Sequence, residues 1–145
     1  MNIKNEMSLN FPSKSCNEAF ARSVVSAFVM NLDPTINELS DIKTAVSEAV
    51  TNCIVHGYRR NSGTIYIKGK ITEDNRVIIK IRDKGCGIAD VKKAMEPLFT
   101  TAPEEERAGL GFAVMQSFCD KVKVKSTPEK GTTVTLEKMI AIEKL

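Results

Sequence analysis

The chain has 145 residues, of which 42% are hydrophobic and 27% are charged, and its formal net charge is +3. A chain of this size and composition is expected to fold as one domain, residues 1–145, with a core that needs neither disulfides nor metal. The lysines are spread along the sequence rather than clustered, so the small charge gives little reason to expect a nucleic-acid partner.

The first half of the chain is predicted to contain one strand and two helices. Residues 3–11 alternate loosely between apolar and polar side chains, which predicts a strand. Apolar residues follow helical spacing over residues 16–32, which predicts the first helix. A second helix is predicted over residues 41–56, with Ser40 as its N-cap and Gly57 at its end.

The second half is predicted to contribute most of the sheet. Two alternating, β-branched runs over residues 64–72 and 76–82 predict a hairpin, and residues 98–108 predict a long functional loop. The other predicted elements are helices over residues 90–95 and 111–119 and strands over residues 121–126 and 132–138. Because the helices come early and the sheet late, we expect an α/β (α+β) two-layer sandwich. Its sheet is expected to be mixed but mostly antiparallel, with helices covering one face.

The cysteines and the N-terminal residues bear on compartment and redox chemistry. The four cysteines form no C-x-x-C pair, which disfavours zinc and redox sites, and Cys53 and Cys119 are expected to be buried in helical patterns. Residues 1–14 lack the apolar segment of a signal peptide, and no run approaches the ~18 apolar residues of a membrane span. We therefore expect a cytoplasmic, reduced protein.

Three polar residues, Glu48, Asn52 and His56, recur at four-residue spacing in the second predicted helix. This spacing places them on one helix face, which for an isolated helix most often faces water. With a binding site beside it, Asn52 could supply a neutral oxygen to Mg²⁺, and Glu48 could take a proton from a hydroxyl. His56 is more typical of a structural or C-capping residue than of a base.

The segment Asp83-Lys84-Gly85-Cys86-Gly87 follows directly on a predicted strand. An aspartate at a strand end can accept a hydrogen bond from an adenine amino group, and the glycines would let backbone pass close to a flat base. A simple turn that closes the strand fits the same residues equally well. The segment lacks a P-loop lysine–serine pair and is not followed by a long helix, so a Walker or Rossmann motif is disfavoured.

Two further glycine motifs complete the pattern. Gly109-Leu110-Gly111-Phe112 lies where a loop is expected to become a helix, and backbone N–H groups at a helix start favour anions such as phosphate. A hinge at the start of the helix is the simpler interpretation. Gly131-Thr132-Thr133 leads into the last predicted strand, and a hairpin glycine followed by two β-branched residues explains it, Thr133 in particular, although Thr132 could reach a bound base through its hydroxyl.

Together these motifs resemble a known family. Glu48-x-x-x-Asn52, D-x-G-x-G, G-x-G-F and G-T-T are similar to the Bergerat (GHKL) ATP-binding fold of gyrase, Hsp90 and histidine kinases. Residues 48–58 and 97–101 further resemble the anti-sigma-factor serine kinases of spore-forming bacteria, and the likeness covers nearly the whole chain. It implies a homodimer that binds and inhibits a sporulation sigma factor and phosphorylates a serine of an anti-anti-sigma protein with ATP and Mg²⁺. It implies neither a direct nucleic-acid partner nor a membrane.

The resemblance also implies a role for each matching residue. Glu48 would be the general base, Asn52 the Mg²⁺ ligand, and Asp83 the adenine acceptor. Arg22 matches a family position that meets protein partners. The residues implied to bind ATP or ADP are Asn52, Asp83, Gly85, Gly87, Thr100, Thr101, Arg107, Gly109, Leu110, Gly111, Phe112 and Thr132.

The chain departs from the family pattern at four positions, and other functions remain open. Ala102 replaces a lid lysine, Lys84 an acidic residue, Ala89 a proline and Ala108 a small hydroxyl residue. The alternative function is an ATP-binding module that sequesters a sigma factor without kinase turnover. A histidine kinase is disfavoured because the only histidine, His56, lies in the nucleotide helix, and a gyrase-like ATPase would need a second domain.

Overall fold

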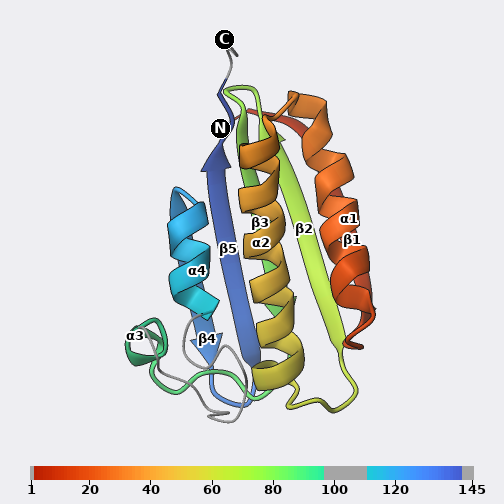
Figure 1. Cartoon of the computed structure of the whole chain (residues 1–145). Coiled ribbons are helices and arrows are strands. Elements are labelled where there is room, and N and C mark those ends of the chain that lie inside the picture. Colours follow the sequence, from red (N-terminus) through yellow and green to blue (C-terminus); the bar gives the residue numbers. More distant parts are fainter. Residues whose placement is uncertain (1, 97–110, 142–145) are drawn as a thin grey trace.

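A computed structural model of the chain describes residues 2–96 and 111–141 (Figure 1). Five strands form one sheet in the order β1-β2-β3-β5-β4, and all four pairings are antiparallel. The strands are β1 (Ile3–Pro12), β2 (Thr64–Thr72), β3 (Arg76–Asp83), β4 (Lys121–Thr127) and β5 (Gly131–Met139). The helices are α1 (Asn17–Val29), η1 (Met30–Leu32), α2 (Ile36–Asn52), η2 (Cys53–Gly57), α3 (Val91–Ala94) and α4 (Gly111–Phe118).

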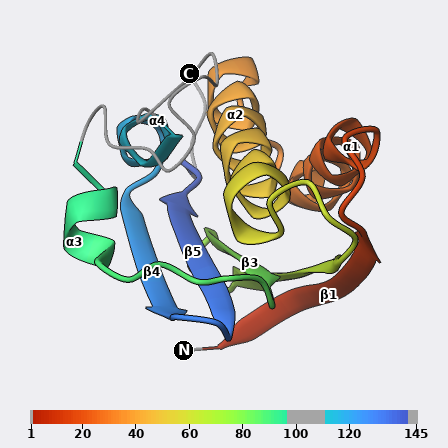
Figure 2. The ribbon, with the colours of Figure 1, turned by 90° about the horizontal axis from the view of Figure 1, so that it is seen from below.

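The helices α1, α2 and α4 lie on one side of the sheet, and no described helix covers the other side (Figure 2). This arrangement confirms the predicted two-layer α+β sandwich, although the described strands include no parallel pair. None of the helices in residues 2–96 and 111–141 is both long enough and apolar enough to cross a membrane. Strand β2 has its predicted bounds, β1, β3 and β4 each gain one residue at their C-terminal end, and β5 gains one at each end.

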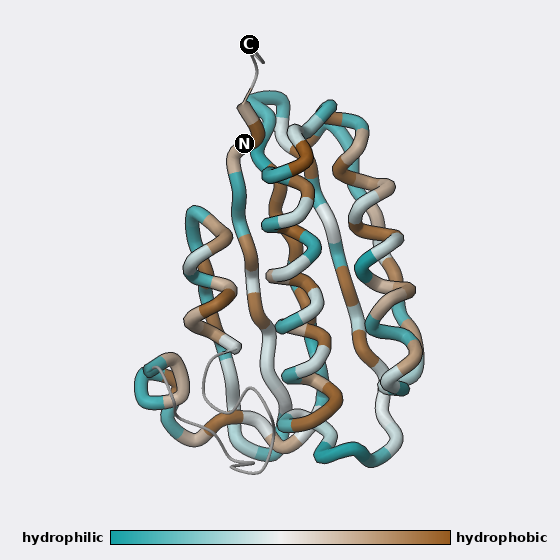
Figure 3. Tube along the Cα trace, viewed as in Figure 1, coloured by the Kyte–Doolittle hydropathy of each residue, from teal (hydrophilic) through white to brown (hydrophobic). Residues whose placement is uncertain are grey.

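Alternation along the strands separates the two faces of the sheet (Figure 3). In β2 the inward Ile65, Ile67 and Ile71 are fully buried against the helices, whereas Lys68 and Lys70 between them are exposed. Burial of such side chains stabilises the fold by roughly 1.5–3 kcal/mol for each one. One face of the sheet therefore forms the core, and the other meets solvent.

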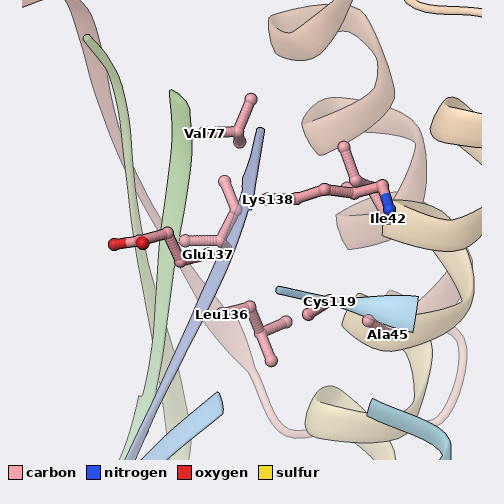
Figure 4. Close-up of a pocket in the computed structure, with 8 residues that line it drawn as sticks. Ile42, Ala45, Val77, Cys119, Leu136, Glu137 and Lys138 are labelled. Atoms are coloured by element: carbon pink, nitrogen blue, oxygen red, sulfur yellow. The ribbon is translucent and has the colours of Figure 1, made fainter. Parts of the chain in front are cut away.

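Strand β5 shows the same division at close range (Figure 4). Leu136 and Lys138 point toward Ile42 and Ala45 of α2, whereas the carboxylate of Glu137 points the other way. These residues line a void of about 10 Å³, too small for more than one water molecule. Lys138 crosses the helix-side layer to Asp41, with 3.4 Å between Nζ and Oδ2. The helices thus pack closely on this part of the sheet.

The start of α2 differs from its prediction. The helix begins at Ile36 rather than at residue 41, and its N-cap is Thr35 rather than Ser40. Thr35 Oγ1 accepts from the Glu38 backbone N–H at 3.1 Å, and Glu38 Oε1 accepts from the Thr35 N–H at 2.8 Å. This reciprocal capping box satisfies two backbone donors at the helix start, which one serine at residue 40 could not do.

Candidate nucleotide-binding site

The polar face of α2 does not face water. Glu48 is only 3% exposed and Asn52 is half-buried. Both lie on the same helix face as Ala45, which shares the void in Figure 4 with Cys119, just beyond the end of α4. Because α2 and α4 pack together, α4 covers this face of α2. Glu48 lies on the covered face, between Ala45 and Asn52. The interpretation of the face as solvated is therefore wrong.

Asn52 lies against the first turn of α4. A Cβ atom added at Gly111 would lie 3.1 Å from the Asn52 Oδ1 atom and 3.2 Å from its Nδ2 atom. The backbone at Gly111 therefore approaches the amide more closely than a side chain would comfortably allow. The motif at residues 48–52 and Gly111 of the last glycine motif, separate in the chain, therefore lie side by side. Phe112, the next residue, is half-buried and packs against the core.

Asp83 ends β3 and is only 4% exposed. Its Oδ1 atom accepts a hydrogen bond from the Gly85 backbone N–H at 2.9 Å. Burial raises the pKa of this carboxyl above its ordinary value, although hydrogen bonds from Gly85, the Cys53 thiol and the Thr132 backbone oppose the rise. These hydrogen bonds hold the Asp83 carboxylate in one orientation, which a directional hydrogen-bond acceptor requires.

The end of η2 lies directly behind Asp83. A Cβ atom on Gly57 would lie 2.7 Å from the Asp83 Cγ and Oδ2 atoms, so only glycine leaves room for this carboxylate. The Gly57 carbonyl accepts from the Cys86 N–H at 2.9 Å, and the His56 carbonyl accepts from Cys86 Sγ at 3.1 Å. Sequence reasoning treated Gly57 only as a helix end. Its second function, as space behind Asp83, depends on a long-range contact that no local pattern indicates.

The D-x-G-x-G segment is a tight turn packed against Gly57, next to Asp83. A Cβ atom on Gly85 would lie 2.0 Å from the Gly57 carbonyl oxygen. Gly87 adopts φ = +72°, a left-handed conformation that glycine adopts without strain. The two interpretations of this segment, turn and site floor, are therefore compatible.

Thr132 lies directly opposite Asp83 in the pairing of β5 with β3. It is 9% exposed, and its Oγ1 atom lies 2.8 Å from the Ser126 Oγ atom. Ser126 also accepts from the Ile88 N–H at 2.7 Å and bonds to the Gly131 carbonyl at 3.0 Å. Sequence reasoning missed Ser126, because a serine in a lysine-rich strand has no distinctive pattern. Its hydroxyl connects the two loops that border Asp83.

Several predicted residues are not brought together here. Arg22 lies on α1, where its Nη1 atom is 2.9 Å from Glu18 Oε1 and 3.2 Å from Ser47 Oγ on α2. The predicted residues Thr100, Thr101, Arg107, Gly109 and Leu110, the predicted loop over residues 98–108, and the departures Ala102 and Ala108 lie outside the described residues. The structure therefore describes the helix wall and the adenine side of the predicted site.

The described part of the chain contains no group of three His, Cys, Asp or Glu residues placed to hold a metal. In nucleotide sites Mg²⁺ takes one or two protein oxygens and completes its shell with phosphate and water, so such a site needs no cluster of this kind. Asn52 offers one such amide oxygen, close to the Gly111 backbone, which carries no side chain there. The donor set therefore suits a magnesium ion delivered with a nucleotide.

Comparison with known proteins agrees with this geometry. The family model of the histidine kinase-like ATPase domain matches residues 11–138. An anti-sigma F factor from Thermoanaerobacter sp. (strain X514) is 59% identical over 99% of this chain and all of its own length. An anti-sigma F factor from Bacillus subtilis (strain 168) is 52% identical over 98% of this chain and 97% of its own.

Solved structures show the same fold at low sequence identity. The RsbU and RsbW domains of Rv1364c from Mycobacterium tuberculosis align with a TM-score of 0.69 at 18% identity. That alignment covers 94% of this chain and 33% of the larger one. The histidine kinase domain of the blue-light activated histidine kinase of Erythrobacter litoralis EL346 aligns with a TM-score of 0.56 at 16% identity, over 85% and 64% of the two chains.

Proposed function

This chain belongs to the anti-sigma F factors, within the histidine kinase-like ATPase family, and on that premise we propose that it is an ATP-dependent serine kinase that inhibits a sigma factor. The kinase-like ATPase domain is the family's property, and the serine acceptor is our proposal. The observation that carries the proposal is the buried Glu48, one turn from Asn52 on the helix face that α4 covers. A site that only bound nucleotide would need no carboxylate there.

The proposed reaction moves the γ-phosphoryl group of ATP to a serine hydroxyl of a partner protein. The serine oxygen forms a new bond to phosphorus, the bond from phosphorus to the bridging oxygen breaks, and ADP leaves with that oxygen. Glu48 takes the proton that the hydroxyl loses. The nucleophile is on the partner, so this chain contributes positioning and the base. A carboxylate shielded from bulk water is suited to accept a proton from a docked hydroxyl rather than from solvent.

Asn52 would hold Mg²⁺ through its amide oxygen, next to the backbone of Gly111. When bound, the ion supplies charge neutralisation at the phosphates. The amide is neutral, so it orients the phosphate side of the site without adding a negative charge to it. Gly111 keeps the space beside Asn52 free of a side chain, and the start of α4 presents backbone N–H groups to an anion.

Asp83 would select adenine. A carboxylate oxygen accepts a hydrogen bond from the adenine 6-amino group, and guanine presents a carbonyl oxygen at that position. The Gly85 N–H occupies Asp83 Oδ1, which fixes the direction of the carboxylate. Thr132, opposite Asp83 across the strand pair, lies beside it. ADP carries the same base, so we expect both ATP and ADP to bind.

The proposed partners are a sporulation sigma factor and a small anti-anti-sigma protein whose serine is the acceptor, and the proposed assembly is a homodimer. Arg22 is a candidate contact with these proteins. Its side chain is 38% exposed, and its guanidinium is oriented by Glu18 and by Ser47, one residue before Glu48 in sequence. A partner that displaced Glu18 from Arg22 would therefore act close to α2.

The test combines titration calorimetry of ATP and ADP with magnesium and transfer of labelled γ-phosphate to the anti-anti-sigma protein. We expect wild-type protein to bind both nucleotides and to label an acceptor serine, and Glu48→Gln to bind ATP without transfer. Glu73→Gln, in the exposed β2–β3 turn, is the matched control and should keep full transfer. Binding without transfer by the wild-type protein would favour the alternative, a sequestering module. Transfer by Glu48→Gln at the wild-type rate would exclude Glu48 as the base.

A further inference from the structure

The open face of the sheet carries a dense group of cations. In β2, β3 and β4 the side chains that point away from the helices are mostly basic and exposed. We call this surface the basic face and define it by seven residues: Lys68, Lys70, Lys80, Arg82, Lys121, Lys123 and Lys125. The chain as a whole has a net charge of only +3, so the basic face concentrates far more positive charge than the molecule's average.

Strand register aligns these cations across the sheet. Lys68 of β2 lies directly opposite Lys80 of β3, and Lys80 pairs with Thr135 of β5, which pairs with Lys123 of β4. These lysines are spread along the sequence, and the fold gathers them because every second residue of a strand points to the same side. The lysines are thus spread along the sequence but clustered on the folded surface.

The positive charge of the basic face is not neutralised within the described chain. None of its seven cations forms an ion pair with a carboxylate of residues 2–96 or 111–141. The outward Glu137 pairs with Arg76, at 3.5 Å, and so is not available to the basic face. Another outward carboxylate, that of Glu6, lies opposite Lys70 in the pairing of β1 with β2, without forming an ion pair with it. Like charges directly opposite each other in a sheet are destabilising, so this arrangement reduces the stability of the fold.

Protection of a sheet edge does not explain the arrangement. Lysines on an edge strand prevent pairing with another chain, and the three lysines of β4 could serve that purpose. Lys68 and Lys80, however, lie on β2 and β3, which are interior strands of the order β1-β2-β3-β5-β4. Like charges at the centre of a sheet face protect no edge, so they indicate a partner.

We propose that the basic face binds the phosphate backbone of a nucleic acid. A protein partner is disfavoured because the centres of protein interfaces are poor in lysine and rich in aromatic anchors. The aromatic ring on this face, Tyr66, lies under Arg82 and Lys84, at 5.9 and 4.9 Å from its centroid. Ile78 is the outward apolar residue of β3, and it provides too little apolar area for a hydrophobic interface with a membrane or a protein. A second copy would bring another cationic face against this one.

The dimensions of the basic face suit a duplex. From β2 to β4 it spans about 14 Å, and from Lys121 to Lys125 about 13 Å. A duplex segment of that length carries roughly eight phosphate charges, a number similar to the seven cations. The face is mostly lysine, whose flexible ammonium groups contact phosphates without reading bases, so binding should be independent of sequence. The proposal is the opposite of the sequence-based expectation that the chain has no direct nucleic-acid partner. No observation tests that expectation.

The test is fluorescence anisotropy of the full chain with a labelled 24-base-pair duplex at 50 to 200 mM salt. We expect wild-type binding that weakens steeply with salt. The variant Lys68→Gln/Lys80→Gln/Lys123→Gln should bind at least about tenfold more weakly at 100 mM salt, and its log–log salt slope should be shallower by about 2.7, at about 0.9 for each lost phosphate contact. ATP titration of the same variant should match wild type, since none of the three lysines contacts Asp83, Asn52 or the Gly57 backbone.

The matched control is Lys14→Gln/Lys43→Gln/Lys92→Gln, which removes the same charge from positions off the sheet. It should keep the wild-type salt slope. Equal weakening by both triple variants would overturn the proposal, because net charge alone would then explain binding. Absence of duplex binding at 50 mM salt would also overturn it. So would binding, dependent on the three face lysines, to phosphatidylglycerol vesicles or polyglutamate but not to the duplex.

Discussion

Replacing Gly57 with alanine tests the placement of Asp83 directly. The added methyl carbon would lie 2.7 Å from the Asp83 Cγ and Oδ2 atoms, about 0.7 Å short of ordinary contact at 3.4 Å. The carboxylate must move, and a shift of that size lengthens its 2.9 Å hydrogen bond from the Gly85 N–H beyond a useful range. Hydrogen bonds to charged groups contribute about 1.5–3 kcal/mol. We therefore expect Gly57→Ala to weaken ATP binding by about tenfold to a hundredfold.

Calorimetric titration of ATP measures this effect, and a denaturant melt shows whether the fold is intact. Because that hydrogen bond lies within the protein, its loss should also lower the free energy of unfolding by about 1.5–3 kcal/mol, partly offset by the better helix propensity of alanine. A double-mutant cycle with Asp83→Asn identifies the route. If Gly57 acts through Asp83, the two changes together should weaken binding little more than either alone. ATP affinity within twofold of wild type in Gly57→Ala, or full additivity in the cycle, would refute the reasoning.

Three other changes test separate parts of the structure. Asp83→Asn should weaken ATP binding yet raise the stability of the nucleotide-free protein at pH 7. The reason is that burial raises the pKa of Asp83, so the folded state favours the protonated carboxyl. Wild-type stability should therefore fall as pH rises from the ordinary aspartate pKa through the raised pKa of the folded state. Urea melts of the variant across this pH window should show no such fall. Ser126→Ala should lower the urea-derived free energy of unfolding by about 1–3 kcal/mol, because the Ile88 N–H loses its acceptor. Thr35→Ala should cost about 1 kcal/mol in the same measurement and leave ATP affinity unchanged, since it removes only the α2 capping box.

The fold could be predicted from local pattern wherever one interaction dominated. Alternation in β2 and β3 sets their inward isoleucines, and the hairpin turn between them is short, so both strands were predicted within a residue. The start of α2 was not, because Ser40 and Thr35 are both acceptable N-caps in isolation. Only the reciprocal bond from Glu38 decides between them, and that signal was present three residues after Thr35.

The site was predictable in its motifs but not in its contacts. Glu48 and Asn52 share a helix face by spacing alone, yet only the packing of α4 on α2 buries that face. The space behind Asp83 depends on Gly57, which is 26 residues away in sequence, and on a backbone contact between η2 and the Gly85 loop. Such long-range contacts follow from the register of the whole sheet, which a local pattern does not determine.

The two-residue period of β3 explains how one strand can serve two surfaces. Arg82 points to the open face, over Tyr66, whereas the adjacent Asp83 points to the helix side and is held by Gly85. Neighbouring residues therefore belong to opposite sides of the sheet, and neutralising one charge need not disturb the other. A slip of one residue in the pairing of β3 would exchange the two side chains. Arg82 would then lie against Gly57, and Asp83 would lie among the lysines of the basic face. Correct register in β3 is thus required for the adenine site and for the basic face together, although ligands at the two surfaces need not affect each other.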